Sequence, residues 1–255
     1  MEGNMTNRYI GITGFTSGIQ IDRLLNRCPM DSDIDPKLMV GVLASSKTIR
    51  HQLTKYAKRY PKIEDIRNIF TEHAICLNLI HFHPESLDNL PDQMMEVIMM
   101  GGKYCHGLQL NAHWVSPEDL MTFRVFDSTS TIVLQVGKNA QEVYGNNPKL
   151  IGEKIKEYQG LVQYALIDPS GGKGEPMDLQ KTEILLETFF EQGLQEAITF
   201  GIAGGISAEM IPQLAPLVKK FGVCIDAEGK LRNEDDEFLP EEAVRYVEES
   251  LKYLT

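Results

Sequence analysis

The sequence lacks several features that mark whole classes of protein. It has 4 cysteines in 255 residues, Cys28, Cys76, Cys105 and Cys224, and no two of them form a Cys-x-x-Cys pair. This spacing predicts neither a zinc ribbon nor a disulfide framework. Cys76 and Cys224 lie inside apolar runs, which indicates reduced, buried thiols in a cytoplasmic protein.

Long hydrophobic runs and an excess of basic charge are also missing. No apolar run approaches the roughly 20 residues that span a bilayer, and the first eight residues are polar, without the apolar core of a signal peptide. The chain has 25 basic and 36 acidic residues, for a formal net charge of −11. Because such a surface repels phosphate backbones and anionic membranes on average, we expect a soluble protein with neither nucleic acid nor a membrane as a partner.

Short apolar runs alternate along the chain with longer helical patterns, and no linker rich in Pro, Gly or Ser divides it. Continuous apolar character is typical of parallel strands buried on both faces. Helical patterns occupy 47–60, 87–100, 182–195 and 240–253, while 29–37 and 137–149 are irregular and are interpreted as loop insertions. The eight predicted strands lie at 9–13, 38–44, 75–83, 107–111, 131–136, 162–168, 197–203 and 221–226.

Eight strands alternating with helices favour either a doubly wound sheet or a closed barrel. Glycine-rich loops follow the sixth and seventh strands, at 168–174 and 201–206. A doubly wound nucleotide-binding fold usually places such a loop after its first strand, whereas barrels commonly bind phosphate late in the chain. We therefore predict one α/β domain over residues 1–255, a (β/α)₈ TIM barrel, a fold that takes about 250 residues.

The loop after the seventh strand is the first candidate site. Gly204 and Gly205 let backbone N–H groups approach an anion, and Ser207 is a candidate N-cap of the next helix. A helix N-terminus attracts phosphate. The alternative is a tight strand-to-helix turn that binds nothing.

Ionisable side chains end two other predicted strands. Asp168 ends the sixth strand, where it is either a proton-transfer group at the barrel mouth or a cap of the following loop. His81 and His83, two apart in the third strand, point to the same side. They are candidates for catalysis, for hydrogen bonding to a substrate or, with Glu85, for a metal, although His-x-His alone is a weak metal signal.

The order of these motifs resembles that of phosphoribosylanthranilate isomerase, a (β/α)₈ barrel that converts an aminoribose phosphate to an aminodeoxyribulose phosphate. The family's Lys-Ile-Cys-Gly-Ile-Thr motif corresponds to Gly-Ile-Thr-Gly-Phe-Thr at 11–16, and its Gln-Leu-His to Gln-Leu-Asn at 109–111. Its strand-six Asp, Gly-Gly-x-Gly loop and second Asp correspond to Asp168, 171–174 and Asp178. Its Ala-Gly-Gly-Leu-x-x-Glu-Asn-Val corresponds to 203–211, and its arginine after strand two to Arg50.

The resemblance implies roles for individual residues. Asp168 matches the family's general acid, but Thr13 stands where the family has the cysteine that acts as general base, which leaves His81 or His83 as the replacement base. The strand-eight Asp-Val-Ser-Ser-Gly is replaced by a stretch containing Asp226 and Glu228, whose charges oppose a phosphate. The predicted ligand-binding residues are Arg50, Gln109, Asn111, Gly172, Gly174, Gly204, Gly205, Ser207 and Asp226.

Two functions follow as hypotheses. In the first, the chain is a sugar-phosphate isomerase of the aldose–ketose type, an intramolecular oxidoreductase that acts on a small phosphorylated substrate. In the second, the barrel binds an anionic ligand without this isomerisation, or uses a metal for other chemistry. We expect a small phosphorylated or anionic molecule as the ligand, a possible homodimer, no cofactor and no bound metal.

Overall fold

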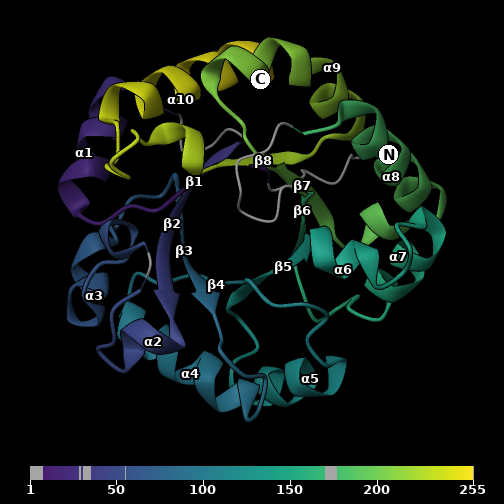
Figure 1. The fold of residues 1–255 in the computed structure, drawn as a ribbon, viewed down its shortest axis with the longest axis horizontal. Coiled ribbons are helices and arrows are strands. Elements are labelled where there is room, and N and C mark those ends of the chain that lie inside the picture. The colour runs from purple at the N-terminus through teal and green to yellow at the C-terminus, as the bar shows by residue number, and fades with distance from the viewer. Residues whose placement is uncertain (1–7, 29, 31–35, 55, 170–176, 255) are drawn as a thin grey trace.

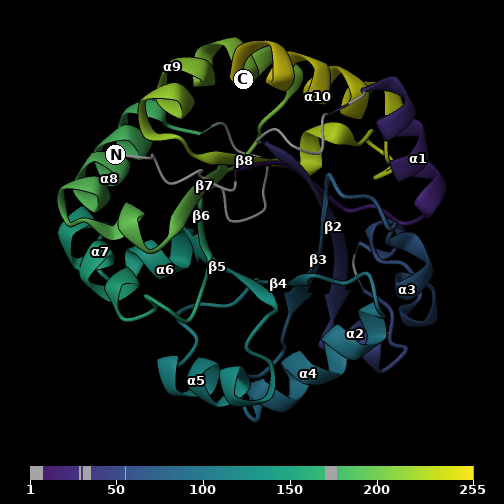
Figure 2. The same ribbon diagram turned by 180° about the vertical axis from the view of Figure 1, so that it is seen from behind.

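Eight parallel strands close into a barrel in the computed structural model, which describes residues 8–28, 30, 36–54, 56–169 and 177–254. Each strand pairs in parallel with its neighbours in the chain, and β8 closes the barrel against β1 (Figures 1 and 2). The TIM-barrel prediction is therefore confirmed. The strands are β1 (Tyr9–Thr13), β2 (Lys37–Ser45), β3 (Cys76–His83), β4 (Gly107–Leu110), β5 (Thr131–Gly137), β6 (Tyr164–Asp168), β7 (Thr199–Ala203) and β8 (Cys224–Ala227).

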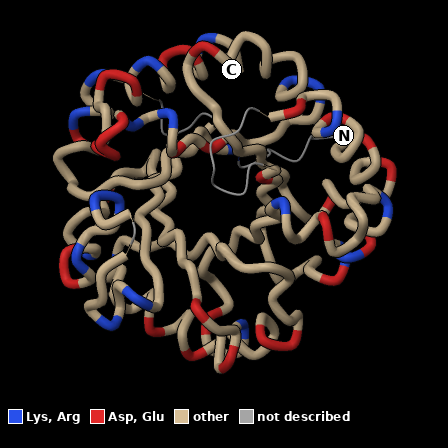
Figure 3. Tube along the Cα trace, viewed as in Figure 1, with Lys and Arg blue, Asp and Glu red and all other residues tan. Residues whose placement is uncertain are grey.

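Helices form the outer ring, and most charged residues lie on this ring and its loops (Figure 3). Within the described ranges, no helix has the length and apolar character needed to cross a membrane. The helices are α1 (Gly18–Arg27), α2 (Ser46–Ile49), α3 (Ile66–Ile69), α4 (Leu90–Gly101), α5 (Pro117–Phe126), α6 (Lys138–Glu142), α7 (Pro148–Lys156), α8 (Leu179–Glu191), α9 (Ile211–Phe221) and α10 (Pro240–Leu254).

Three predicted segments need correction. In place of the helix expected at 47–60, the structure has the four-residue α2 and a 3₁₀ turn at Ala57–Arg59, because His51 adopts a left-handed backbone with φ of 56° just after α2. The irregular segment 137–149 instead contains α6 and the start of α7, whose first N–H groups are capped by the side chain of Asn147. In the segment 29–37, Lys37 already belongs to β2, and residues 29 and 31–35 lie outside the described part of the chain.

The strands bury side chains on both faces. Their outer faces pack against the helices in one large apolar core. Alternate residues point into the barrel, where a smaller cluster fills its interior. This cluster consists of Tyr9, Met39, Leu77, Leu79, Val133, Tyr164, Leu166, Ala203 and Cys224.

All four cysteines are free thiols, and Cys28, Cys76 and Cys224 are buried. The prediction of reduced, buried thiols at positions 76 and 224 is thus confirmed by the structure.

Candidate active site

A polar layer lies above the apolar cluster, at the C-terminal ends of the strands. Every second residue of a strand points into the barrel, and the inward-facing residues at these ends form the layer. On β3 the inward-facing residues are Leu77, Leu79 and then His81, and on β6 the last of them is Asp168. Every member of the layer is at least nine-tenths buried. The layer consists of Thr13, His81, Gln109, Gln135, Asp168 and Asp226.

A cavity of about 60 Å³ opens in this layer. It brings together six residues predicted from the sequence and several that were not. The predicted residues in its lining are His81, Gln109, Asp168, Gly204, Gly205 and Asp226. Residues that sequence reasoning did not assign to the site are Arg59, Gln135, Leu166, Ala203, Glu228 and Gly229.

Asp226 is the most strongly perturbed carboxyl group of the cavity. Burial, with the negative charge of Glu228 as the next cause, raises its pKa from 3.8 to about 8, against the opposing effect of a hydrogen bond from Thr13. The Thr13 Oγ1 lies 3.2 Å from both carboxylate oxygens. Thr13 therefore contacts a proton-carrying group, although Thr13 itself lies behind the cavity lining.

Two glycines make room for this pair. A Cβ atom at Gly41 would lie 2.6 Å from the Thr13 Oγ1, and one at Gly11 would lie 2.9 Å from the Asp226 Oδ1. Neither contact is compatible with a side chain. The strands β1 and β2 thus use glycine where the polar layer approaches their backbone.

His81 is buried, and its ring lies near the negative charges of Glu228 and Asp168. Desolvation lowers its pKa below 6.5, although the negative charges of Glu228 and Asp168 act in the opposite direction. Neither ring nitrogen has a hydrogen-bond partner within the described ranges. The imidazole is therefore neutral near pH 7 and carries a ring lone pair that is free to accept a hydrogen bond or a proton.

Two glutamines complete the polar layer. The Gln135 Nε2 donates a 3.0 Å hydrogen bond to the Asp168 Oδ2. The Oε1 atoms of Gln109 and Gln135 are buried and accept no hydrogen bond from any described residue. Because buried polar atoms are nearly always paired in native proteins, these acceptors and the His81 ring point to a polar ligand in the cavity. Extending the inward series on β5 from Val133 would have identified Gln135 from the sequence.

Arg59 is the cation of the site, and its position was not foreseen. Its Nη1 lies 2.7 Å from the Glu228 Oε1 and its Nε 2.6 Å from the Asp236 Oδ1, with 19% of the side chain exposed. The sequence suggested that Glu228 would repel a phosphate, whereas the ion pair offsets that charge. No sequence motif marked Arg59, because it comes from the β2–β3 connection and reaches β8 only in the folded chain.

The glycine loop after β7 has the expected geometry in part. Gly204 and Gly205 have φ values of 113° and 64°, which residues with a Cβ rarely adopt. Ser207 occupies the N-cap position of the 3₁₀ turn Ala208–Met210, but its side chain makes no capping hydrogen bond to the backbone. The predicted residues Gly172 and Gly174 lie outside the described residues.

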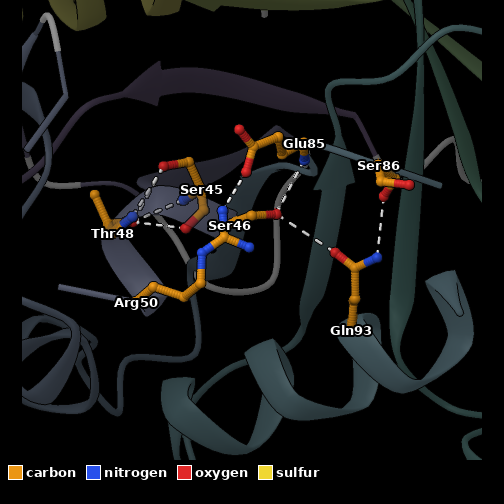
Figure 4. A network of polar contacts seen from close by, with 7 residues as sticks. All are labelled: Ser45, Ser46, Thr48, Arg50, Glu85, Ser86 and Gln93. Atoms are coloured by element: carbon orange, nitrogen blue, oxygen red, sulfur yellow. Dashed lines mark hydrogen bonds and ion pairs between the residues drawn. The ribbon is translucent and has the colours of Figure 1, made fainter. Parts of the chain in front are cut away.

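Three other predicted residues lie at the rim. Arg50 is half exposed and forms an ion pair with Glu85 in a polar network between the ends of β2 and β3 (Figure 4). His83 is exposed, and its Nδ1 lies 3.1 Å from the backbone carbonyl oxygen of Asn111. Arg50, His83 and Asn111 therefore stand outside the cavity lining, as do Thr13 and Ser207.

Metal ligation was the other interpretation of His81, His83 and Glu85. Among the residues that the structure describes, no group of three or more His, Cys, Asp or Glu side chains is arranged to hold a metal ion. Glu85 instead pairs with Arg50.

Known proteins resemble this chain in structure rather than in sequence. No protein-family model and no curated protein sequence matches it. The structure of phosphoribosyl anthranilate isomerase from Thermus thermophilus superposes with a TM-score of 0.62 at 13% identity, covering 96% of this chain and 98% of that one. This chain has the fold of that isomerase.

Two further structures of the same isomerase extend the comparison. One is a complex with reduced 1-(o-carboxyphenylamino)-1-deoxyribulose 5-phosphate, with a TM-score of 0.61, 13% identity and coverage of 96% and 99%. The other shows monomers generated from the dimeric enzyme of Thermotoga maritima, with a TM-score of 0.63, 13% identity and the same coverage. The resemblance inferred from the motif order is thus confirmed at the level of the fold.

Proposed function

We propose that this chain is a sugar-phosphate isomerase of the aldose–ketose type that acts on a small phosphorylated substrate. The observation that carries the proposal is the pairing, in one buried cavity, of a neutral imidazole with a carboxyl group whose pKa is raised to about 8. The fold is shared with isomerases, one of them in complex with a phosphorylated ketose analogue.

Isomerisation of this type needs one group that removes a proton and one that delivers a proton. A proton leaves the carbon beside the carbonyl carbon, and a proton is added at the former carbonyl carbon. At the same time the carbonyl oxygen gains a proton and the neighbouring hydroxyl group loses one, so no external oxidant or reductant takes part. Near pH 7 His81 is neutral and able to accept the first proton, while Asp226 is protonated and able to deliver the second. Asp168, held by Gln135, is the second carboxyl group of the cavity and the one that the resemblance favours as the acid.

In this assignment, His81 takes the place of the cysteine that acts as general base in the family. Thr13 is not the base in this proposal; it positions Asp226 through its hydroxyl group. His81 is preferred to His83 because His81 lines the cavity and His83 is exposed at the rim.

Substrate binding is assigned to the side of the cavity formed by the ends of β7 and β8. Gly204 and Gly205 present backbone N–H groups close to the ligand, and the ion pairs of Arg59 offset the charge of Glu228 beside it. The volume of about 60 Å³ is far below the roughly 300 Å³ or more of a pocket for a drug-sized ligand. It favours a small substrate whose reacting carbons enter the cavity while the phosphate stays at the glycine loop.

The test measures proton abstraction directly. Aldose and ketose phosphates that raise the melting temperature of the protein are incubated with it in D₂O, and loss of the ¹H signal beside the carbonyl carbon is followed by NMR. Wild-type protein should exchange that proton, and His81→Gln should slow the exchange about 10²-fold or more. His83→Gln is the matched control and should retain the exchange rate.

The outcomes separate the two hypotheses. Stabilisation by sugar phosphates without proton exchange in the wild-type protein would support the binding-only alternative and reject isomerisation. Equal exchange in wild-type and Asp168→Asn protein would remove Asp168 from the chemistry. Full exchange in His81→Gln protein would reject the proposed base.

Homodimerisation stays a prediction. One of the structurally similar isomerases is described as dimeric, and sedimentation equilibrium of this chain would decide between a monomer and a homodimer.

A further inference from the structure

A second cavity lies at the opposite end of the barrel. It has a volume of about 470 Å³ and is lined by residues at or just before the first residues of β2, β3, β4 and β5, among them Lys37, His73, His106 and Thr131. We call it the N-terminal pocket. It shares no lining residue with the cavity around His81 and Asp226.

Two histidines of the N-terminal pocket have a defined tautomer. The backbone N–H of Ile75 donates to the His73 Nδ1 at 3.3 Å, and the backbone N–H of Asn78 donates to the His106 Nδ1 at 2.9 Å. A backbone N–H can only donate, so each Nδ1 is the unprotonated acceptor. In the neutral rings the proton is therefore on Nε2, and each ring retains one N–H donor that the backbone does not use.

Lys37 places a positive charge beside these donors. Its ammonium group lies close enough to His106 to contribute, after burial, to the lowered pKa of that ring. Lys37 is half buried, and its side chain takes part in none of the ion pairs or hydrogen bonds of the described chain. Among the described residues, Lys37 is therefore a cation near an imidazole without an acidic partner.

Two acidic residues next to the pocket are already paired, since Glu72 accepts a hydrogen bond from the Tyr104 hydroxyl group and Asp127 binds its own turn. The Asp127 Oδ1 accepts hydrogen bonds from the backbone N–H groups of Thr129 and Ser130, and its Oδ2 accepts the Ser130 hydroxyl. These bonds lower the pKa of Asp127 and hold its carboxylate in the turn before β5. Within the described residues, no hydrogen bond or ion pair joins Asp127 to Lys37 or to the two imidazoles.

We infer that the N-terminal pocket binds a small oxyanion, a phosphate or carboxylate group, through the Lys37 Nζ and the Nε2–H groups of His73 and His106. Three donors around one pocket, each with no acceptor in the described chain, match the acceptor oxygens of such a group. The site is independent of the proposed isomerase activity, since it uses none of the same residues.

The test titrates inorganic phosphate, and in a second arm malonate, into the full-length protein at low ionic strength, where charge screening is weak. Long-range ¹H–¹⁵N NMR of the histidine rings follows the binding. The ring signals of His73 and His106 should shift along a saturable curve with at least one of the two anions, and the anion that binds more tightly identifies the preferred group. The apo spectrum should show both rings protonated at Nε2.

Variants distinguish binding in the N-terminal pocket from a general effect of net charge and from binding in the cavity around His81 and Asp226. Lys37→Met should weaken binding at His106 about fivefold. Lys219 is exposed on α9 and forms no ion pair with a described residue, so Lys219→Met should leave the binding unchanged. His106→Asn, which keeps an acceptor for the Asn78 N–H but removes the Nε2–H donor, should weaken binding at His73. Arg59→Met should leave both histidine curves unaltered.

Two results would overturn the inference. One is the absence of a saturable shift at His73 and His106 with either anion. The other is equal weakening by Lys37→Met and Lys219→Met, which would reduce the effect to net charge. Failure of the proton-exchange test at His81 would leave these expectations untouched.

Discussion

Replacement of Asp226 by asparagine removes a titrating carboxyl group from the barrel mouth while preserving its size. The pKa of Asp226 is about 8 in the folded protein against an ordinary value of 3.8. Between these two values the folded protein holds a proton that the unfolded chain has released. The unfolded chain binds fewer protons there, so the free energy of unfolding falls as the pH rises.

The size of this change in the free energy of unfolding follows from the pH interval between the two pKa values. The stability linked to Asp226 is fully present below pH 3.8 and is lost progressively until the pH passes about 8. Each pH unit inside the window is worth about 1.4 kcal/mol. Between pH 5 and pH 8 the wild-type protein should therefore lose about 4 kcal/mol through this one group.

Urea unfolding at pH 5, pH 6.5 and pH 8 measures the effect. The Asp226→Asn variant should lose about 4 kcal/mol less stability than the wild type across this range, because its amide does not titrate. The Asp235→Asn variant, at an exposed position in the same β8–α10 connection, should follow the wild-type curve. Parallel curves for wild-type and Asp226→Asn protein would show that Asp226 is ionised in the folded state, and would refute both the raised pKa and its role as a proton donor.

Two further predictions concern the barrel frame. Gly41→Ala should destabilise the protein by about 1–3 kcal/mol, because the new Cβ would lie 2.6 Å from the Thr13 Oγ1. Its control is Gly229→Ala, where no atom lies within 4 Å of the added Cβ, and this variant should change stability by less than about 0.5 kcal/mol. Arg124→Ala removes a half-buried guanidinium group that donates to several backbone carbonyl groups, and it should lower the free energy of unfolding by about 1–3 kcal/mol. Its control is Arg23→Ala at an exposed ion pair, which should lower the free energy of unfolding by no more than about 1 kcal/mol. Urea unfolding midpoints of the four variants test both predictions. Equal midpoints for the two glycine variants would contradict the steric argument, and equal midpoints for the two arginine variants would contradict the hydrogen-bond argument.

The strands were predictable because their signal is local. A parallel strand buried on both faces has to be apolar along its length, and each predicted run overlaps an observed strand within a few residues. The helix prediction at 47–60 failed because composition does not reveal a left-handed residue such as His51. In the segment 137–149, α6 was missed because it has only five residues, and the start of α7 was missed because it depends on the cap at Asn147.

The candidate site also has residues that the sequence could predict and residues that it could not. Asp168, His81 and Gly204 stand at strand ends, and in a TIM barrel the C-terminal ends of all strands meet at one mouth, so their convergence was predictable. Arg50 was predicted as a ligand-binding residue from its match to the family's arginine after strand two, whereas Arg59 is the arginine that lines the cavity. Both belong to the β2–β3 connection, and only its path decides which of them reaches β8.

By itself, the sequence determined the eight-unit alternation, the barrel that follows from it and the strand ends that carry ionisable groups. These features depend on periodicity and on the order of residues along the chain. Only the tertiary structure decided that Asp226 is protonated, that His81 is neutral and that Glu228 is offset by Arg59. The physical reason is that a pKa and an ion pair depend on burial and on neighbours from distant strands, which come together only when the barrel closes.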